Sequence, residues 1–194
     1  MYCILIGGQP ASGKSRFAEY LSKEISIPMV SKDIIKEKMF DTIGFKCREE
    51  KVKLGVAAMD ILYYFAEENM KVNKPFILEN NFENSSKEKL EEILKKYDYT
   101  PINVIFTGDT EVLHKRFLER DISPSRHRGH VVNTQYPEVN KEEYIPMTIE
   151  KYKSFKDRGM ADFHIGDKII TVDTTDFNKV NYEEIVNDIR SLIK

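Results

Sequence analysis

A short apolar run, a glycine-bounded loop and a helical pattern open this chain, and no other feature limits its possible folds as strongly. The apolar run is Tyr2–Ile6, the loop runs from Gly8 to Ser15, and the helical pattern begins near Lys14. Glycines at both ends let the backbone curl with its N–H groups pointing inward, and the helix adds its positive dipole end. This G-x-x-x-x-G-K-[ST] spacing between a strand and a helix predicts a phosphate-binding loop in an α/β protein.

The side chains of this loop have separate expected roles. Lys14 would reach the β- and γ-phosphates of a nucleotide, and the Ser15 hydroxyl would ligate Mg²⁺. The residues that we expect to contact the nucleotide are Gly8, Gln9, Pro10, Ala11, Ser12, Gly13, Lys14, Ser15 and Arg16. An ordinary glycine-containing turn is the alternative interpretation, but lysine, hydroxyl, flanking strand and flanking helix together favour nucleoside triphosphate binding.

Composition narrows the class of protein. With 194 residues, 41% hydrophobic and 32% charged, the chain is expected to form a single domain over residues 1–194 with a sizeable core. The net charge of −2 provides no general attraction to nucleic acid or to a membrane. No apolar stretch is long enough to span a bilayer, and Cys3 and Cys47 form neither a disulfide framework nor a zinc site, so a cytoplasmic location is expected.

Apolar runs alternate with helical patterns along the chain, which predicts a parallel sheet with helices on both faces. Strands are predicted at Tyr2–Ile6, Ile27–Val30, Phe76–Glu79, Ile102–Thr107 and Lys168–Val172. Helices are predicted at Lys14–Ile25, Asp33–Phe40, Glu50–Val72, Ser86–Tyr97, Thr110–Asp121, Lys141–Arg158 and Tyr182–Ile193. The segment 122–144 is irregular and partly basic, and such an insertion is usually a lid or a disordered loop.

Acidic and amide residues follow two of these strands, at the sheet edge where ligands bind. Asp33 can accept the proton of an acceptor hydroxyl, although it is equally suited to cap the next helix. Glu79 ends an apolar strand and can bind Mg²⁺ through water, although Asp is the commoner residue there. Asn80 and Asn81 follow, either lining an acceptor pocket or forming a turn.

Four arginines precede or occupy the irregular segment. Arg116 and Arg120 lie one helical turn apart and share a face, with Arg126 and Arg128 beyond them. They can form a solvated face paired with neighbouring acids, but a phosphate loop in the same chain favours a clamp on the transferred phosphoryl group. Arg116, Arg120 and Arg126 are the candidates for this catalytic role, and the pattern does not choose among them.

These motifs together resemble the small P-loop kinases. The resemblance rests on Gly-x-Pro-x-Ser-Gly-Lys-Ser, Ser-Lys-Asp-x-x-Lys, Leu-Glu-Asn-Asn-Phe, Arg-x-x-x-Arg and Arg-His-Arg-Gly-His. The chain is most similar to the polynucleotide 5′-kinase, chloramphenicol phosphotransferase and zeta-toxin branch, the AAA-type predicted kinases. The resemblance implies a three-layer P-loop NTPase fold with a five-stranded parallel sheet of order 2-3-1-4-5, and an arginine-bearing lid over residues 122–144.

The resemblance also implies site residues. Asp33 matches the general base, Thr174 and Thr175 match the loop that borders adenine, and Lys36 stands where polynucleotide kinases tend to have arginine. It implies ATP with Mg²⁺, and the absence of an Asn-Lys-x-Asp motif favours ATP over GTP.

The sequence therefore predicts an ATP-dependent phosphotransferase that acts on a hydroxyl group. The acceptor is a small metabolite, a nucleotide-sugar or a polynucleotide 5′ end, and net charge gives no support to nucleic acid. A regulatory nucleotide-binding ATPase without an acceptor is the alternative, and the oligomeric state is left open.

Overall fold

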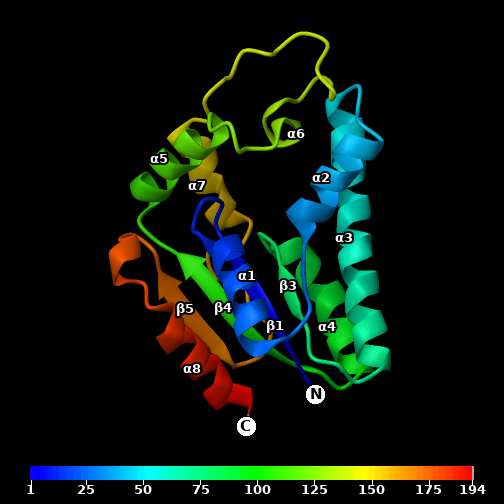
Figure 1. Cartoon of the computed structure of the whole chain (residues 1–194), viewed down its shortest axis with the longest axis vertical. Coiled ribbons are helices and arrows are strands. Elements are labelled where there is room, and N and C mark those ends of the chain that lie inside the picture. Colours follow the sequence, from blue (N-terminus) through cyan, green and yellow to red (C-terminus); the bar gives the residue numbers. More distant parts are fainter. Residues whose placement is uncertain (194) are drawn as a thin grey trace.

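The computed structural model describes residues 1–193, which form a parallel sheet between two layers of helices (Figure 1). The strands are β1 (Tyr2–Gly8), β2 (Met29–Ser31), β3 (Ile77–Glu79), β4 (Thr100–Thr107) and β5 (Ile169–Asp173). The helices are α1 (Lys14–Ile25), α2 (Lys32–Thr42), α3 (Arg48–Lys71), α4 (Lys87–Lys96), α5 (Thr110–Asp121), α6 (Arg128–Val131), α7 (Ile149–Asp157) and α8 (Tyr182–Ile193). Two 3₁₀ turns, η1 (Asn84–Ser86) and η2 (Phe177–Lys179), complete the elements.

The sheet has the order β2-β3-β1-β4-β5 with every neighbouring pair parallel, as the sequence predicted. In register, Ile4 of β1 lies between Ile77 of β3 and Ile102 of β4. Because β1 is central, the loop that follows it emerges at the middle of the carboxyl edge, with the ends of β2 and β3 on one side.

Alternation along β1 explains the two helical layers. Cys3 and Leu5 face the core formed with α3 and α4, whereas Ile4 and Ile6 face the core formed with α1 and α8. A parallel strand covered on both faces reads as one continuous apolar run, which is the pattern of residues 2–6. Each such buried aliphatic side chain stabilises the fold by about 1.5–3 kcal/mol.

The prediction of one helix over Lys141–Arg158 is wrong in its first half. Helix α7 begins only at Ile149, and residues 139–148 are irregular. Pro146 lacks an N–H group and disfavours helical geometry at Ile145, while the Thr148 hydroxyl accepts a hydrogen bond from the N–H of Lys151 and starts the helix there. Within residues 122–144 the short helix α6 also forms, which the sequence did not indicate.

Within residues 1–193, no helix combines the length and the apolar character that crossing a membrane requires.

Candidate active site

The loop after β1 is shaped by its glycines. Gly8 has a φ of 134° and Gly13 a φ of 89°, both outside the range that other residues favour. A Cβ atom on Gly8 would overlap the backbone of Phe106 in β4, so only glycine fits where the chain leaves the sheet. Gly13 immediately precedes α1, so Lys14 and Ser15 occupy its first turn, where backbone N–H groups are unsatisfied.

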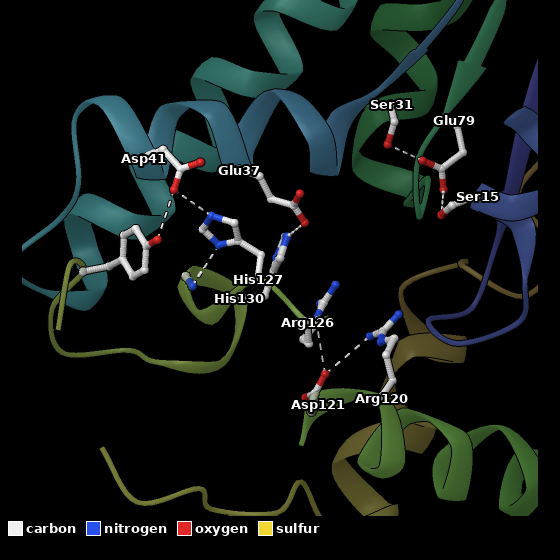
Figure 2. Close-up of polar contacts among 12 residues, drawn as sticks. Ser15, Ser31, Glu37, Asp41, Glu79, Arg120, Asp121, Arg126, His127 and His130 are labelled. Carbon is white, nitrogen blue, oxygen red and sulfur yellow. Dashed lines mark hydrogen bonds and ion pairs between the residues drawn. The ribbon is translucent and has the colours of Figure 1, made fainter. Parts of the chain in front are cut away.

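Three side chains meet at the carboxylate of Glu79, which ends β3. Figure 2 shows two of them, Ser15 and Ser31. The Ser15 hydroxyl donates a hydrogen bond to Oε1 (2.9 Å), and the Ser31 hydroxyl donates one to Oε2 (2.5 Å). Nζ of Lys14 lies 3.8 Å from Oε1, and both members of this pair are buried, with exposed fractions of 5% and 2%. Burial lowers the pKa of Lys14, and the charges of Glu79 and Asp33 oppose this shift.

This cluster fits a magnesium site. A serine hydroxyl and a carboxylate are hard oxygen donors, and Ser15 and Glu79 bring them within hydrogen-bond distance. Among the described residues no group of three or more His, Cys, Asp and Glu side chains could hold a metal. A divalent ion here would therefore take its remaining ligands from phosphates and water, which is how Mg²⁺ is usually bound beside a nucleotide.

Asp33 lies in the first turn of α2 and is partly buried. It does not cap this helix: Ser31 is the N-cap residue, and within residues 1–193 the Asp33 carboxylate makes no hydrogen bond. Burial raises the pKa of Asp33, but nearby cationic groups outweigh that effect and hold the pKa below its usual value. These groups are, in decreasing order of effect, His130, Lys14, Arg126 and Lys36. Asp33 is thus an ionised carboxylate among cations.

Arg120 of α5 and Arg126 beyond it approach each other across Asp121 (Figure 2). Their nearest nitrogens lie 3.7 and 3.5 Å from Oδ1 of Asp121. Nε of each arginine is buried and donates no hydrogen bond within residues 1–193. Burial lowers the pKa of Arg120, and the charge of Arg126 adds to that shift. Two neighbouring guanidinium groups with unused donors can bind an anion.

The other two arginines, Arg116 and Arg128, bind groups within the fold. Arg116 donates hydrogen bonds to the carbonyl oxygens of Thr174 (2.5 Å) and Thr175 (2.9 Å). Its guanidinium carbon lies 4.0 Å from the centre of the Phe177 ring. Arg128 forms a two-pronged ion pair with Glu138, at 2.7 and 2.6 Å. The structure therefore separates Arg120 and Arg126, which face each other, from the two arginines that fasten loops.

The loop after β5 was predicted to border adenine, and it forms a wall of the cavity beside the phosphate loop. The side chain of Thr174 is buried and donates to the carbonyl of Thr107, and that of Thr175 donates to Asp173, so both hydroxyls are used within the fold. Phe177, 44% exposed, lines the cavity instead. The sequence reasoning missed Phe177; an aromatic residue two positions beyond Thr175 was the available signal.

Two cavities flank the cluster. The first, of about 500 Å³, is lined by Ala11, Gly13, Lys14, Ser15, Arg16, Arg116, Glu119, Arg120 and Phe177. The second, of about 450 Å³, lies between α2, α3 and the segment after β3, and includes the predicted substrate residues Lys36, Asn80 and Asn81. We call it the acceptor cavity; its further lining residues are Lys32, Val52, Gly55, Val56, Met59, Asp60, Tyr63, Glu83, Ser85, Ser86 and Arg158.

Residues 127–136 are fastened to α2 and α3. Nε2 of His130 lies 2.9 Å from Glu37, and Nε2 of His127 lies 2.9 Å from Asp41 (Figure 2). Nζ of Lys51 donates to the carbonyls of His130 (2.9 Å) and Val132 (2.5 Å). These contacts were not predicted. The signal was present in the spacing of Asp33, Glu37 and Asp41, which places three acids on one helix face.

Comparisons with known proteins agree with this architecture. A family model described as an AAA domain matches residues 3–137. The crystal structure of a "putative kinase" from Chloroflexus aurantiacus J-10-fl superposes with a TM-score of 0.82 and 28% sequence identity, covering 98% of this chain and 97% of that chain.

Two further solved structures share the fold at low identity. An unliganded sugar kinase from Janibacter sp. HTCC2649 gives a TM-score of 0.55 at 12% identity, covering 100% of this chain and 93% of that one. A gluconokinase from Sinorhizobium meliloti 1021 gives 0.52 at 16% identity, covering 96% and 87%. None of the curated proteins matches the chain.

Proposed function

The chain belongs to the AAA domain family, and we propose that it is an ATP-dependent phosphotransferase that moves the γ-phosphoryl group to a hydroxyl group of an acceptor. The observation that carries this proposal is the convergence of Lys14, Ser15 and Glu79 at one sheet edge, with the ionised Asp33 nearby. An ATPase needs the first three groups as well, and Asp33 is the carboxylate that could orient the hydroxyl group of a second substrate.

The first cavity is the donor site in this proposal. The loop amides and Lys14 hold the phosphates, and the N-terminus of α1 adds its dipole. The base lies towards Phe177 and Arg116, because an exposed aromatic ring beside a fixed guanidinium offers a stacking surface. Ser15 and Glu79 would hold Mg²⁺, which would neutralise charge on the β- and γ-phosphates.

The acceptor half rests on Asp33. Its carboxylate accepts a hydrogen bond from the acceptor hydroxyl and orients the oxygen towards the γ-phosphorus. The bond from this oxygen to phosphorus forms, the bond from phosphorus to the β,γ-bridging oxygen breaks, the proton passes to Asp33, and ADP leaves. The lowered pKa of Asp33 makes it a weak base, which suits a loose transition state in which the proton leaves late.

Arg120 and Arg126 supply positive charge to the transferred group. Negative charge is spread over the equatorial oxygens of the phosphoryl group in the transition state, and a guanidinium pair with unused donors stabilises it there. Arg116 is placed at the base end because its donors already bind the Thr174 and Thr175 carbonyls.

Two variants test the proposal. Lys14→Ala should lose ATP binding and turnover, because the phosphates lose their principal cation. Asp33→Asn keeps the size of the side chain, so it should bind ATP normally in calorimetry and lose transfer by about 100-fold or more. Normal transfer by Asp33→Asn to an accepted substrate would show that the general-base assignment is wrong.

A further inference from the structure

The acceptor cavity is lined by two lysines that form no ion pair, and Nζ of one of them, Lys36, lies 5.4 Å from the centre of the Phe40 ring. Lys32 and Lys36 project from α2 into it, and neither forms an ion pair with any residue in the described chain 1–193. Arg158, the third cation of the lining, is neutralised by Glu83 through two hydrogen bonds. Asp60 is the remaining acid in the cavity. The two lysines therefore leave a net positive charge on the α2 side.

The charge extends beyond the lining. Burial lowers the pKa of Lys36, and three more cations, Lys32, Arg48 and Arg126, lower it further, against the single opposing charge of Asp33. Like charges gathered at partly buried positions destabilise one another. A bound anion would offset the repulsion among these cations.

Uncharged polar groups face the same space. Asn80, only 7% exposed, donates its one side-chain hydrogen bond to the sulfur of Met59 at 3.6 Å, a weak acceptor. Oδ1 of Asn81 is buried with no partner among residues 1–193. Both residues line the cavity, and neither carboxamide has its full set of strong hydrogen bonds within the fold. Carboxamides of this kind bind hydroxyl groups.

We propose that the acceptor is a small polyhydroxylated molecule with its own anionic group, a carboxylate or a phosphate ester, bound by Lys32 and Lys36. This inference rests on the proposed function. Asp33 is not among the residues that line the cavity, but Lys36 lies three residues from it on α2. An anionic group held by Lys36 would therefore lie about one helical turn from a hydroxyl held by Asp33. The volume of about 450 Å³ and the walls formed by Val52, Val56 and Met59 suit a compact molecule rather than a polymer end.

Anion binding can be measured without turnover. With the donor site filled by Mg²⁺ and a non-hydrolysable ATP analogue, inorganic phosphate is titrated calorimetrically, since the γ-phosphate position is then occupied. We expect one phosphate site, weakened about 10-fold or more in Lys36→Gln and in Lys32→Gln. The control Lys38→Gln, on the exposed side of the same helix, should bind like the wild type. No phosphate binding, or binding unaffected by both variants, overturns the proposal.

Measurements of turnover then distinguish a failure of this inference from a failure of the proposed function. ADP release is measured with matched pairs that differ in the anionic group: gluconate and sorbitol, glycerate and glycerol, ribose 5-phosphate and ribose. We expect the anionic member to be preferred by about 10-fold or more in kcat/KM, and Lys36→Gln to reduce the preference. Equal or better use of the neutral members leaves a kinase but removes the anionic acceptor. Preference for a 5′-hydroxyl oligonucleotide over every small molecule also overturns it.

Discussion

Replacing Glu79 by glutamine removes the only carboxylate within 4 Å of Lys14 in the described chain while keeping the size of the side chain. At 3.8 Å and an effective dielectric constant of about 20, the attraction between the two charges is about 4 kcal/mol. Both groups are buried, so solvent does not screen them. The amide oxygen of glutamine can accept a hydrogen bond from only one of the two serines that Glu79 now accepts from, Ser15 and Ser31, because its NH2 group is a donor. The pKa of Lys14 falls further when its charged partner is lost.

We therefore expect Glu79→Gln to lower the free energy of unfolding by about 2–4 kcal/mol, with a fall in melting temperature of about 5–15 °C. Chemical denaturation and calorimetry without nucleotide measure both quantities. The matched control is Glu67→Gln, which removes the half-buried partner of the exposed Lys96 at 3.0 Å and should cost about 1 kcal/mol or less. Equal losses in the two variants would refute the buried pair.

Two further variants examine the base end of the donor site and the fastening of residues 127–136. Because the chain has no tryptophan, Phe177→Trp introduces a single tryptophan at the proposed base site. ATP should change the tryptophan emission, tripolyphosphate should not, and a control Tyr64→Trp on α3 should respond to neither. Tryptophan emission from Phe177→Trp that ATP leaves unchanged would contradict that placement. Burial, with the charges of Lys36 and Arg48, lowers the pKa of Lys51 from 10.5 to about 7, so between these values the unfolded chain holds a proton that the folded one lacks. Stability should thus rise with pH more steeply in the wild type than in Lys51→Met, by up to about 1.4 kcal/mol per unit between pH 7.5 and 9.5 in urea unfolding, and parallel profiles would contradict this.

The sheet could be predicted because its determinants are local. The run Tyr2–Ile6 and the glycine loop define one strand and its exit, and every other predicted strand overlaps an observed one. Strand order, by contrast, depends on which apolar runs pair, and it came from the resemblance to small P-loop kinases. The false helix over 141–148 shows the opposite case, in which charged, helix-favouring residues such as Lys141 and Glu143 concealed the effect of Pro146.

In the candidate site, too, some residues are placed by local sequence and others by contacts between distant parts of the chain. Lys14 and Ser15 are fixed by the loop spacing, and Glu79 by the end of its strand, so the sequence placed them together. The roles of the arginines depend on contacts distant in sequence: Arg116 binds carbonyls 58 and 59 residues away. The contacts of His127 and His130 with α2 likewise join residues far apart in the chain. The spacing of the acids on α2 is visible in the sequence, but no local pattern indicates which side chains contact them.

The central claim is that the γ-phosphoryl group leaves ATP for a hydroxyl acceptor rather than for water. ATP labelled in its γ-phosphate, incubated with Mg²⁺, the wild-type protein and a pool of hydroxylated acceptors, measures this directly. We expect the label in an organic phosphate ester with the wild type, and its loss with Asp33→Asn. Label released only as inorganic phosphate, whatever acceptor is present, would contradict the account and identify an ATPase.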